Sequence, residues 1–247
     1  MLPKAVKSDK ISFMSEGQTV QSGGAKSMPS YEEMIKAGVH YGRKKTVLHP
    51  NMKPFIYSLK ETIHILDVLK TEEKTREAIE FLKKTKDEAG VILWVASTPQ
   101  SQEKIIEIGH KLNMPYVANR WVGGLLTNFK TLSSRVKYMI DLEDKLNNPE
   151  VTKEMIKKER VKLEKELKKL KIKFDGIRSM EKLPQAVFIT SLRESKLAVR
   201  EAKRLGIKTV SIVNTESNPA LVDFPIPAND NAKQSVNLIL DTIIKNI

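Results

Sequence analysis

Positively charged side chains gather in three stretches of this sequence, and each stretch also holds glycines, prolines or aromatic rings. The first stretch, residues 38–57, contains three consecutive cations, Arg43 to Lys45, and Lys53 follows eight residues later. Its two prolines disfavour a regular helix. Lysine and arginine neutralise phosphates, while aromatic and guanidinium planes stack on unpaired bases. The chemistry that suits this stretch is the binding of a structured RNA.

Two further stretches repeat this combination. Residues 119–137 surround the glycines Gly123 and Gly124 with cations and rings, and residues 173–184 carry further cations in a loop. The glycine pair favours a tight turn over a ligand-binding loop, and Trp121 suits a hydrophobic core as well as it suits stacking. Adjacent cations cannot all be buried without a large free-energy cost. The predicted RNA-binding side chains are His40, Tyr41, Arg43, Lys44, Lys45, Lys53, Arg120, Trp121, Asn128 and Lys130.

The residues that catalysis requires are missing from this pattern. The sequence has no cysteine, and its four histidines lack the paired spacing of a zinc site. A phosphate-cradling loop needs glycines directly after a strand, but no glycine follows Ser97 or Thr190 closely. We predict no catalytic residue, no metal and no cofactor. A nucleotide-dependent enzyme is an alternative hypothesis, with Thr98, Arg193 and Asn214 at the strand ends as ligand contacts.

The composition favours a polyanionic partner. Lys and Arg number 43 against 30 Asp and Glu, which gives a formal net charge of +13, and basic surfaces attract nucleic acid from a distance. The sequence contains no run of about 18 apolar residues, which is the length that a membrane-spanning helix needs. The polar, glycine- and serine-containing residues 1–28 indicate a disordered, mildly basic arm. We expect a cytoplasmic protein with no membrane partner and no small-molecule substrate.

The cationic stretches need a scaffold, and the apolar pattern predicts a doubly wound α/β fold. Near-continuous apolar runs mark strands that are buried on both faces of a mostly parallel sheet. Helical stretches alternate with these runs, which implies crossover connections. A short strand near residues 63–68 is expected to extend the same layer, and Asn229 or Asp230 to cap the last helix. The four predicted strands are Val91–Ser97, Tyr116–Ala118, Ala186–Thr190 and Thr209–Val213.

Residues 128–173 interrupt this alternation. Apolar residues recur there at three- and four-residue steps on both sides of Pro149, which predicts an antiparallel coiled-coil hairpin of two helices inserted into the α/β domain. The α/β domain would then comprise residues 29–127 and 174–247. The lysines of the hairpin suit a solvated surface and also a contact with RNA or protein, and a free scaffold built around the hairpin is a third functional hypothesis.

Five motifs, in the same order along the chain, resemble those of the bacterial-type small ribosomal subunit protein two family. They are "AGVHYGRKKTVLHPNMKPFIY", "IHILDVLKT", "NRWVGGLLTNFKTL", "FDGIRSMEKLPQAVFI" and "AVREAKRLGIKTVSIVNTESNPALVDFPIPANDNAKQSV". The resemblance runs from about Tyr31 to Ile244. It implies a flavodoxin-like fold with a protruding coiled-coil hairpin and no enzymatic activity.

The resemblance also implies partners. Members of the family bind small-subunit ribosomal RNA near the junction of head and body, contact neighbouring ribosomal proteins and help to recruit ribosomal protein one. Residues 38–42 and 120–128 match family motifs, whereas Arg43 stands where a histidine is common. Residues 191–195 and 214–219 depart from the family pattern and thin out its acidic groups at the strand ends. These departures weaken the case for a metal or nucleotide there.

Overall fold

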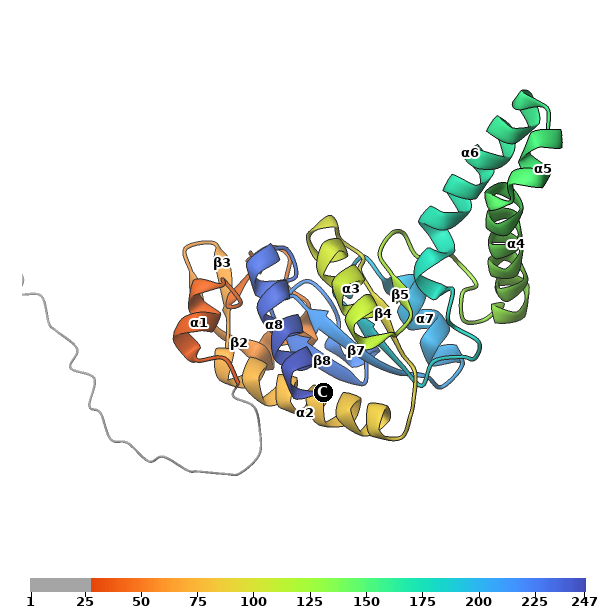
Figure 1. Ribbon diagram of the computed structural model, residues 1–247. Coiled ribbons are helices and arrows are strands. Elements are labelled where there is room, and N and C mark those ends of the chain that lie inside the picture. Colours follow the sequence, from red (N-terminus) through yellow and green to blue (C-terminus); the bar gives the residue numbers. More distant parts are fainter. Residues whose placement is uncertain (1–27) are drawn as a thin grey trace, which may run out of the picture.

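A five-stranded parallel sheet forms the centre of the molecule (Figure 1). The computed structural model describes residues 28–247, so the predicted arm, residues 1–28, lies outside it except for Met28. The strand order is β5-β4-β6-β7-β8. The strands are β4 (Ile92–Val95), β5 (Tyr116–Val117), β6 (Ala186–Ile189), β7 (Lys208–Val213) and β8 (Phe224–Pro227). The first four confirm the predicted strands.

Both faces of this sheet are covered, which explains the near-continuous apolar runs. Every residue of β4 and β6 is buried. Because side chains alternate between faces along a strand, Ile92 and Trp94 of β4 join one core cluster, and Leu93 and Val95 join a second. The first face packs on α2 (Val68–Asp87), α3 (Pro99–Leu112) and α8 (Lys233–Asn246). The second packs on α7 (Lys196–Arg204), and the fold is therefore doubly wound.

The prediction that a strand near residues 63–68 extends this layer is wrong. That strand, β3 (Ile63–Leu66), lies in a separate antiparallel sheet between β1 (Tyr41–Lys44) and β2 (Ile56–Lys60). The connection from β2 to β3 is too short for a parallel crossover, which needs a dozen or more residues. The helix α1 (Tyr31–Lys36) precedes this small sheet, and a 3-10 helix, η1 (Pro50–Phe55), lies between β1 and β2. The cationic stretch is more regular than its prolines suggested.

Two other details differ from the prediction. The edge strand β8 was not predicted, because two of its four residues are proline, which is tolerated at sheet edges. A short 3-10 helix, η3 (Pro219–Leu221), precedes it. Neither Asn229 nor Asp230 caps α8, which begins at Lys233 after Ala232. Asp230 has another task, which is described below.

The segment between β5 and β6 consists of helices that project from the α/β layers (Figure 1). They are α4 (Phe129–Asn147), α5 (Pro149–Glu154) and α6 (Lys157–Phe174), and the 3-10 turn η2 (Asp175–Ile177) leads back to the sheet. Pro149 begins α5 rather than a simple turn, because proline is tolerated at the first position of a helix.

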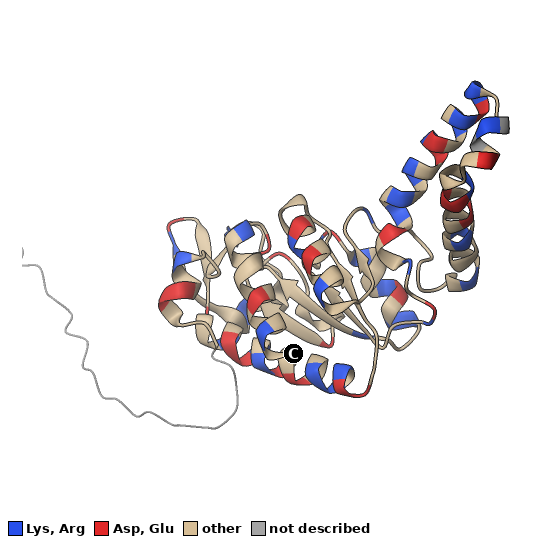
Figure 2. Ribbon diagram, in the orientation of Figure 1, with Lys and Arg blue, Asp and Glu red and all other residues tan. Residues whose placement is uncertain are grey.

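The long helices α4 and α6 contact each other through polar as well as apolar groups. The Tyr138 hydroxyl on α4 donates to the Glu166 carboxylate on α6 at 3.2 Å, and Lys171 pairs with Glu143. Figure 2 shows cations along both helices with acidic residues between them. The division of the chain into an α/β domain and an inserted coiled coil stays a prediction.

Candidate nucleic-acid interface

The predicted RNA-binding residues lie at two separate places. His40 to Lys53 belong to β1, η1 and their connection, beside the loops that follow β7 and β8. Arg120 to Lys130 belong to the loop after β5 and the start of α4. The loop of the second group contacts α7 instead, and the two groups lie apart in the fold (Figure 1). The single set of residues predicted from sequence is therefore two surfaces.

Backbone contacts hold residues 42–49 against the loop after β7. The Arg43 N–H donates to Thr215 Oγ1 at 2.9 Å, and the His49 N–H donates to the Thr215 carbonyl oxygen at 2.9 Å. A β-carbon at Gly42 would lie 2.6 Å from Thr215 Cγ2 and 2.9 Å from the His64 carbonyl oxygen. Only glycine allows β1 to approach this loop so closely.

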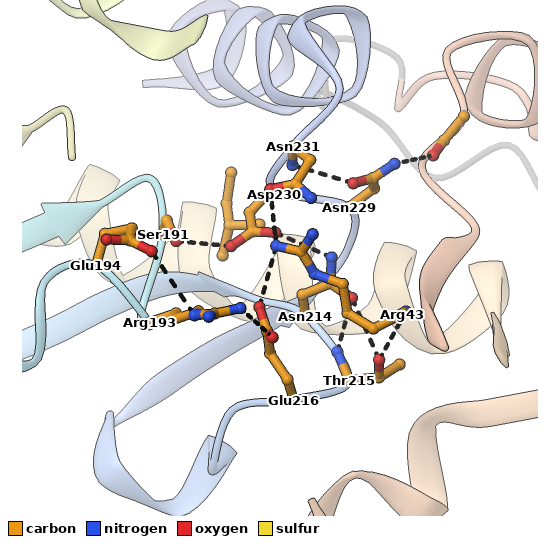
Figure 3. Close-up of polar contacts among 12 residues, drawn as sticks. Arg43, Ser191, Arg193, Glu194, Asn214, Thr215, Glu216, Asn229, Asp230 and Asn231 are labelled. Carbon is orange, nitrogen blue, oxygen red and sulfur yellow. Dashed lines mark hydrogen bonds and ion pairs between the residues drawn. The ribbon is translucent and has the colours of Figure 1, made fainter. Parts of the chain in front are cut away.

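The Arg43 side chain turns inward, into a cluster of polar groups at the carboxyl ends of the strands (Figure 3). Its Nη2 lies 2.7 Å from Asn231 Oδ1, 3.0 Å from Glu216 Oε1 and 3.5 Å from Asp230 Oδ1. Arg193 pairs with the other oxygen of Glu216. We call this group, together with Ser191, Asn214 and Thr215, the Arg43 cluster. The positive charge of Arg43 is compensated within the fold.

Asp230 is the buried centre of the Arg43 cluster. Its side chain is 2% exposed, and its carboxylate accepts from Ser191 Oγ at 2.6 Å and from Asn214 Nδ2 at 2.9 Å. Buried charges need such partners, because an unpaired carboxylate loses its hydration without compensation. From the sequence, Asp230 is predicted as a possible cap of the last helix. Its partners are distant in the sequence, and no local pattern indicates them.

The residues proposed for a nucleotide site are engaged with other protein groups. Asn214 and Arg193 bond within the Arg43 cluster. Thr98 is buried, and its hydroxyl lies 3.2 Å from the Ser101 hydroxyl. Ligands of doubly wound sheets bind outside the carboxyl ends of the strands. At the ends of β7 and β8 this edge is occupied by the chain's own Arg43.

The lysines beside Arg43 face solvent. Lys44, Lys45 and Lys53 are exposed, and within residues 28–247 none of them lies in an ion pair. The backbone around them is ordered, because the Lys45 N–H donates to the Thr62 carbonyl at 2.7 Å and the Val47 N–H to the Lys44 carbonyl at 2.9 Å. Together with Tyr41, which is 48% exposed, they form what we call the first surface.

His40 and Tyr41 pack against each other at the border of the first surface. Their ring centroids are 4.1 Å apart. Partial burial lowers the pKa of His40 below its usual value, and the positive charge of Lys60 lowers the pKa further. His40 is therefore a neutral imidazole at physiological pH and adds no positive charge to the first surface.

A single carboxylate organises the loop between β5 and α4. Glu201 on α7 accepts at Oε1 from Trp121 Nε1 at 3.0 Å and from the Gly124 N–H at 2.8 Å. Its Oε2 accepts from the Leu126 N–H at 3.1 Å and from the Thr127 N–H and hydroxyl at 3.3 Å each. The Trp121 ring packs on the second core cluster. The indole is anchored in the protein, which favours packing over stacking on RNA.

Glu201 is ionised in spite of its position. Burial alone would raise the pKa of this carboxyl, but the hydrogen bonds from Trp121 and from the loop backbone outweigh that effect and lower the pKa below its usual value. Sequence reasoning missed Glu201. The available signal was an acidic residue on the same helical face as Ala198 and Ala202, where an apolar side chain is expected.

The other predicted residues of this region are exposed. Arg120, Asn128 and Lys130 are exposed, and neither of the two cations pairs with an acidic residue in the part of the chain that the structure describes. Asn128 precedes α4, but its side chain makes no capping bond. We call these three residues the second surface.

Residues 28–247 show neither a metal site nor a membrane-spanning helix. They contain no group of three or more acidic or histidine side chains arranged to hold a metal ion. None of the helices formed by these residues is long and apolar enough to cross a membrane.

Comparison with known proteins agrees with the architecture. The family model of ribosomal protein S2 matches residues 34–247. The small ribosomal subunit protein uS2 of Dictyoglomus thermophilum is 41% identical over 212 residues, which are 86% of this chain and 86% of the relative. The uS2 of Thermus thermophilus is 38% identical over 213 residues, 86% and 83% of the two chains. That of Bifidobacterium longum is 40% identical over 207 residues, 84% and 74%.

Proposed function

The chain belongs to the ribosomal protein S2 family, and on this premise we propose that it binds small-subunit ribosomal RNA through two separate cationic surfaces. As a member of this family it is a structural component of the small ribosomal subunit, a cytoplasmic particle in bacteria, and it is not an enzyme. It acts in translation by associating with ribosomal RNA and other ribosomal proteins. The finer proposal concerns which side chains do so.

The observation that carries the proposal is how the charges near the first surface are distributed. Arg43 forms ion pairs with the carboxylates of Glu216 and Asp230, and Arg193 forms a further ion pair with Glu216. Lys44, Lys45 and Lys53 are left exposed on an ordered backbone. Such cations suit phosphate contacts, because binding would neither break a salt bridge nor require the backbone to become ordered.

The second surface supports the same proposal in a different way. Arg120 and Lys130 flank the loop whose N–H groups donate to Glu201 on α7. Asn128 has an exposed side-chain amide that can bond to a base edge or a sugar. Because the first surface lies beside the loops after β7 and β8 and the second lies over α7, the protein would contact RNA at two places. The place near the junction of head and body is proposed from the family resemblance alone.

Recruitment of ribosomal protein one requires a surface for a protein. An apolar hollow of about 360 Å³ lies beside the first surface, between α1, β2 and the start of α2. Its rim includes Tyr57, Leu69, Ile35 and Tyr31, which are 76%, 60%, 53% and 48% exposed. Exposed apolar groups of this size indicate a protein contact rather than a phosphate contact. We propose that a neighbouring protein, with protein one as the candidate, docks here.

The RNA proposal is tested by removing charge from the first surface. The double variant Lys44→Gln, Lys45→Gln should bind less tightly to small subunits depleted of this protein. The slope of log affinity against log salt should become less steep by about 1.4 to 1.8, for two lost phosphate contacts. Lys83→Gln, Lys84→Gln is the matched control, because these two adjacent lysines are exposed on α2 away from both surfaces. Equal behaviour of the two variants would contradict the proposal.

The protein-docking proposal has its own test. Tyr57→Ala combined with Leu69→Ala should lower the protein-one content of purified small subunits while the RNA affinity stays unchanged. Ile156→Ala, between α5 and α6, removes a side chain of similar exposure, 73%, and serves as the control. An unchanged protein-one content in the double variant would remove the hollow from consideration.

A further inference from the structure

We infer that Arg43 is a positioning residue: it anchors β1 to the carboxyl edge of the sheet and thereby fixes where Lys44 and Lys45 meet RNA. Adjacent cations of one strand would then have different tasks, one toward the protein and two toward the ligand. The inference rests on the proposed function of the first surface. It reassigns the cation that the sequence placed among the RNA contacts.

The charges around Arg43 argue against direct phosphate binding. The side chains of its two acidic partners, Glu216 and Asp230, are 6% and 2% exposed, whereas that of Arg43 is 26% exposed. If Arg43 turned toward a phosphate, it would leave these two carboxylates with less compensation in a site from which water is largely excluded. An approaching phosphate would also be repelled by them. The contacts favour an arginine that stays where it is.

The strand geometry explains how Arg43 and Lys44 come to face different ways. In the pairing of β1 with β3, Tyr41 lies opposite Ile65 and Lys44 lies opposite Ile63, so β1 contains one extra residue between these pairs. A bulge of this kind re-aims a side chain locally. Arg43 enters the cluster, and Lys44 resumes the pairing with its side chain in solvent.

Further contacts anchor the same segment to the same loops. Gly42 touches Thr215, and the Asn51 side-chain amide donates to Asn218 Oδ1 at 3.0 Å. On the other side, Asn229 Nδ2 donates to the Gly38 carbonyl oxygen at 3.1 Å. Arg43 is the charged centre of this row of contacts. Loosening it would free the turn that carries Lys44 and Lys45.

The decisive variant is Glu216→Gln, which weakens the hold on Arg43 and removes no positive charge. We expect its affinity for small subunits depleted of this protein to fall about tenfold or more. The salt slope, measured between about 50 and 200 mM salt, should become less steep by about 1.4 to 1.8, because Lys44 and Lys45 lose their places. If Arg43 contacted phosphate directly, the same variant would release it and bind equally well or more tightly.

Glu194→Gln is the matched control. Glu194 is exposed and lies 3.7 Å from Arg193, so the change removes the same charge nearby but leaves the partners of Arg43 in place. Its affinity and salt slope should equal those of the natural protein. Hydrogen exchange at the Lys45 and His49 amides should be faster in Glu216→Gln and unchanged in Glu194→Gln.

Arg43→Lys provides a second test that conserves charge. A lysine ammonium lacks the planar fork of a guanidinium and cannot reproduce its contacts with three side chains, so affinity and slope should again fall. A direct phosphate contact would survive this exchange. Retained binding in both Arg43→Lys and Glu216→Gln would overturn the inference. If Lys44→Gln, Lys45→Gln also bound normally, the proposed function of the first surface would fall with it.

Discussion

The two cationic surfaces are ordered by opposite devices. On the first surface, Arg43 belongs to the surface segment itself and pairs with two carboxylates at the strand ends. On the second, a carboxylate from the helix below, Glu201, gathers N–H groups of the surface loop. In both cases, buried carboxylates lie next to a backbone segment that they hold in one conformation.

The difference decides how many cations remain for a partner. The first surface uses one of its cations to hold itself in place, so Lys44 and Lys45 are what remains of the adjacent three. The second surface uses none, since its anchor is an anion from another element, and Arg120 and Lys130 both remain exposed. Under the proposed function, a count of charges along the sequence would overestimate the RNA contacts of the first surface but not those of the second.

The largest expected effect is the loss of the anchor of the second surface. Glu201→Ala leaves the indole N–H and three backbone N–H groups without their acceptor, and should lower the free energy of unfolding by about 3 kcal/mol or more. Urea denaturation measures this change, and Trp121 fluorescence should report the loosened loop. Glu194→Ala, an exposed carboxylate near the start of α7, is the control and should change the stability by less than about 0.5 kcal/mol.

A smaller loss is expected where the first surface meets the sheet. Gly42→Ala places a methyl group 2.6 Å from Thr215 Cγ2, and overpacking of this kind costs about 1 to 3 kcal/mol. Thr215→Ser removes that Cγ2 and keeps the hydroxyl that accepts from the Arg43 N–H. The double variant should recover part of the lost stability. Full stability of Gly42→Ala alone would mean that β1 is not pressed against this loop.

Much of the scaffold follows from sequence, and the reason is local. β4 and β6 are short runs of apolar residues because both of their faces are covered, and α4 and α6 show helical periodicity because they pack on each other. β8 escapes the same reasoning because its prolines resemble a loop. The short strand β3 was assigned to the wrong sheet, since an apolar run does not reveal its partner.

The organisation of the two surfaces could not be predicted in the same way. Arg43 lies far from Glu216 and Asp230 in the sequence. Glu201 likewise bonds to a loop more than 70 residues earlier. Such pairs leave no trace in local spacing. The sequence identified the cationic regions, although the first contains β1 and η1 instead of an irregular loop. Whether a given charge is internal or external was decided by contacts between distant residues.

A pH titration tests whether the charge of Glu201 holds the loop of the second surface. Because the pKa of Glu201 is lowered below its usual value of 4.5, its stabilising effect is complete above that value and is lost as the pH falls through the lower pKa of the folded state. The stability difference between the natural protein and Glu201→Gln should be constant well above that usual value and shrink as the pH falls below it. A difference that does not change with pH would show that the charge of Glu201 is irrelevant to the loop.

The smallest effect on stability, and the sharpest contrast, is expected from Arg120→Gln. This exposed side chain pairs with no acidic residue among residues 28–247, so the free energy of unfolding should change by less than about 0.5 kcal/mol. The salt slope for binding to depleted subunits should nevertheless become less steep by about 0.7 to 0.9, which corresponds to one phosphate contact. On the second surface, one lost cation would then equal one lost contact. On the first surface, Glu216→Gln should lose contacts without losing a cation. A change in the salt slope of Arg120→Gln that corresponds to two phosphate contacts, or to none, would contradict this one-to-one relation on the second surface.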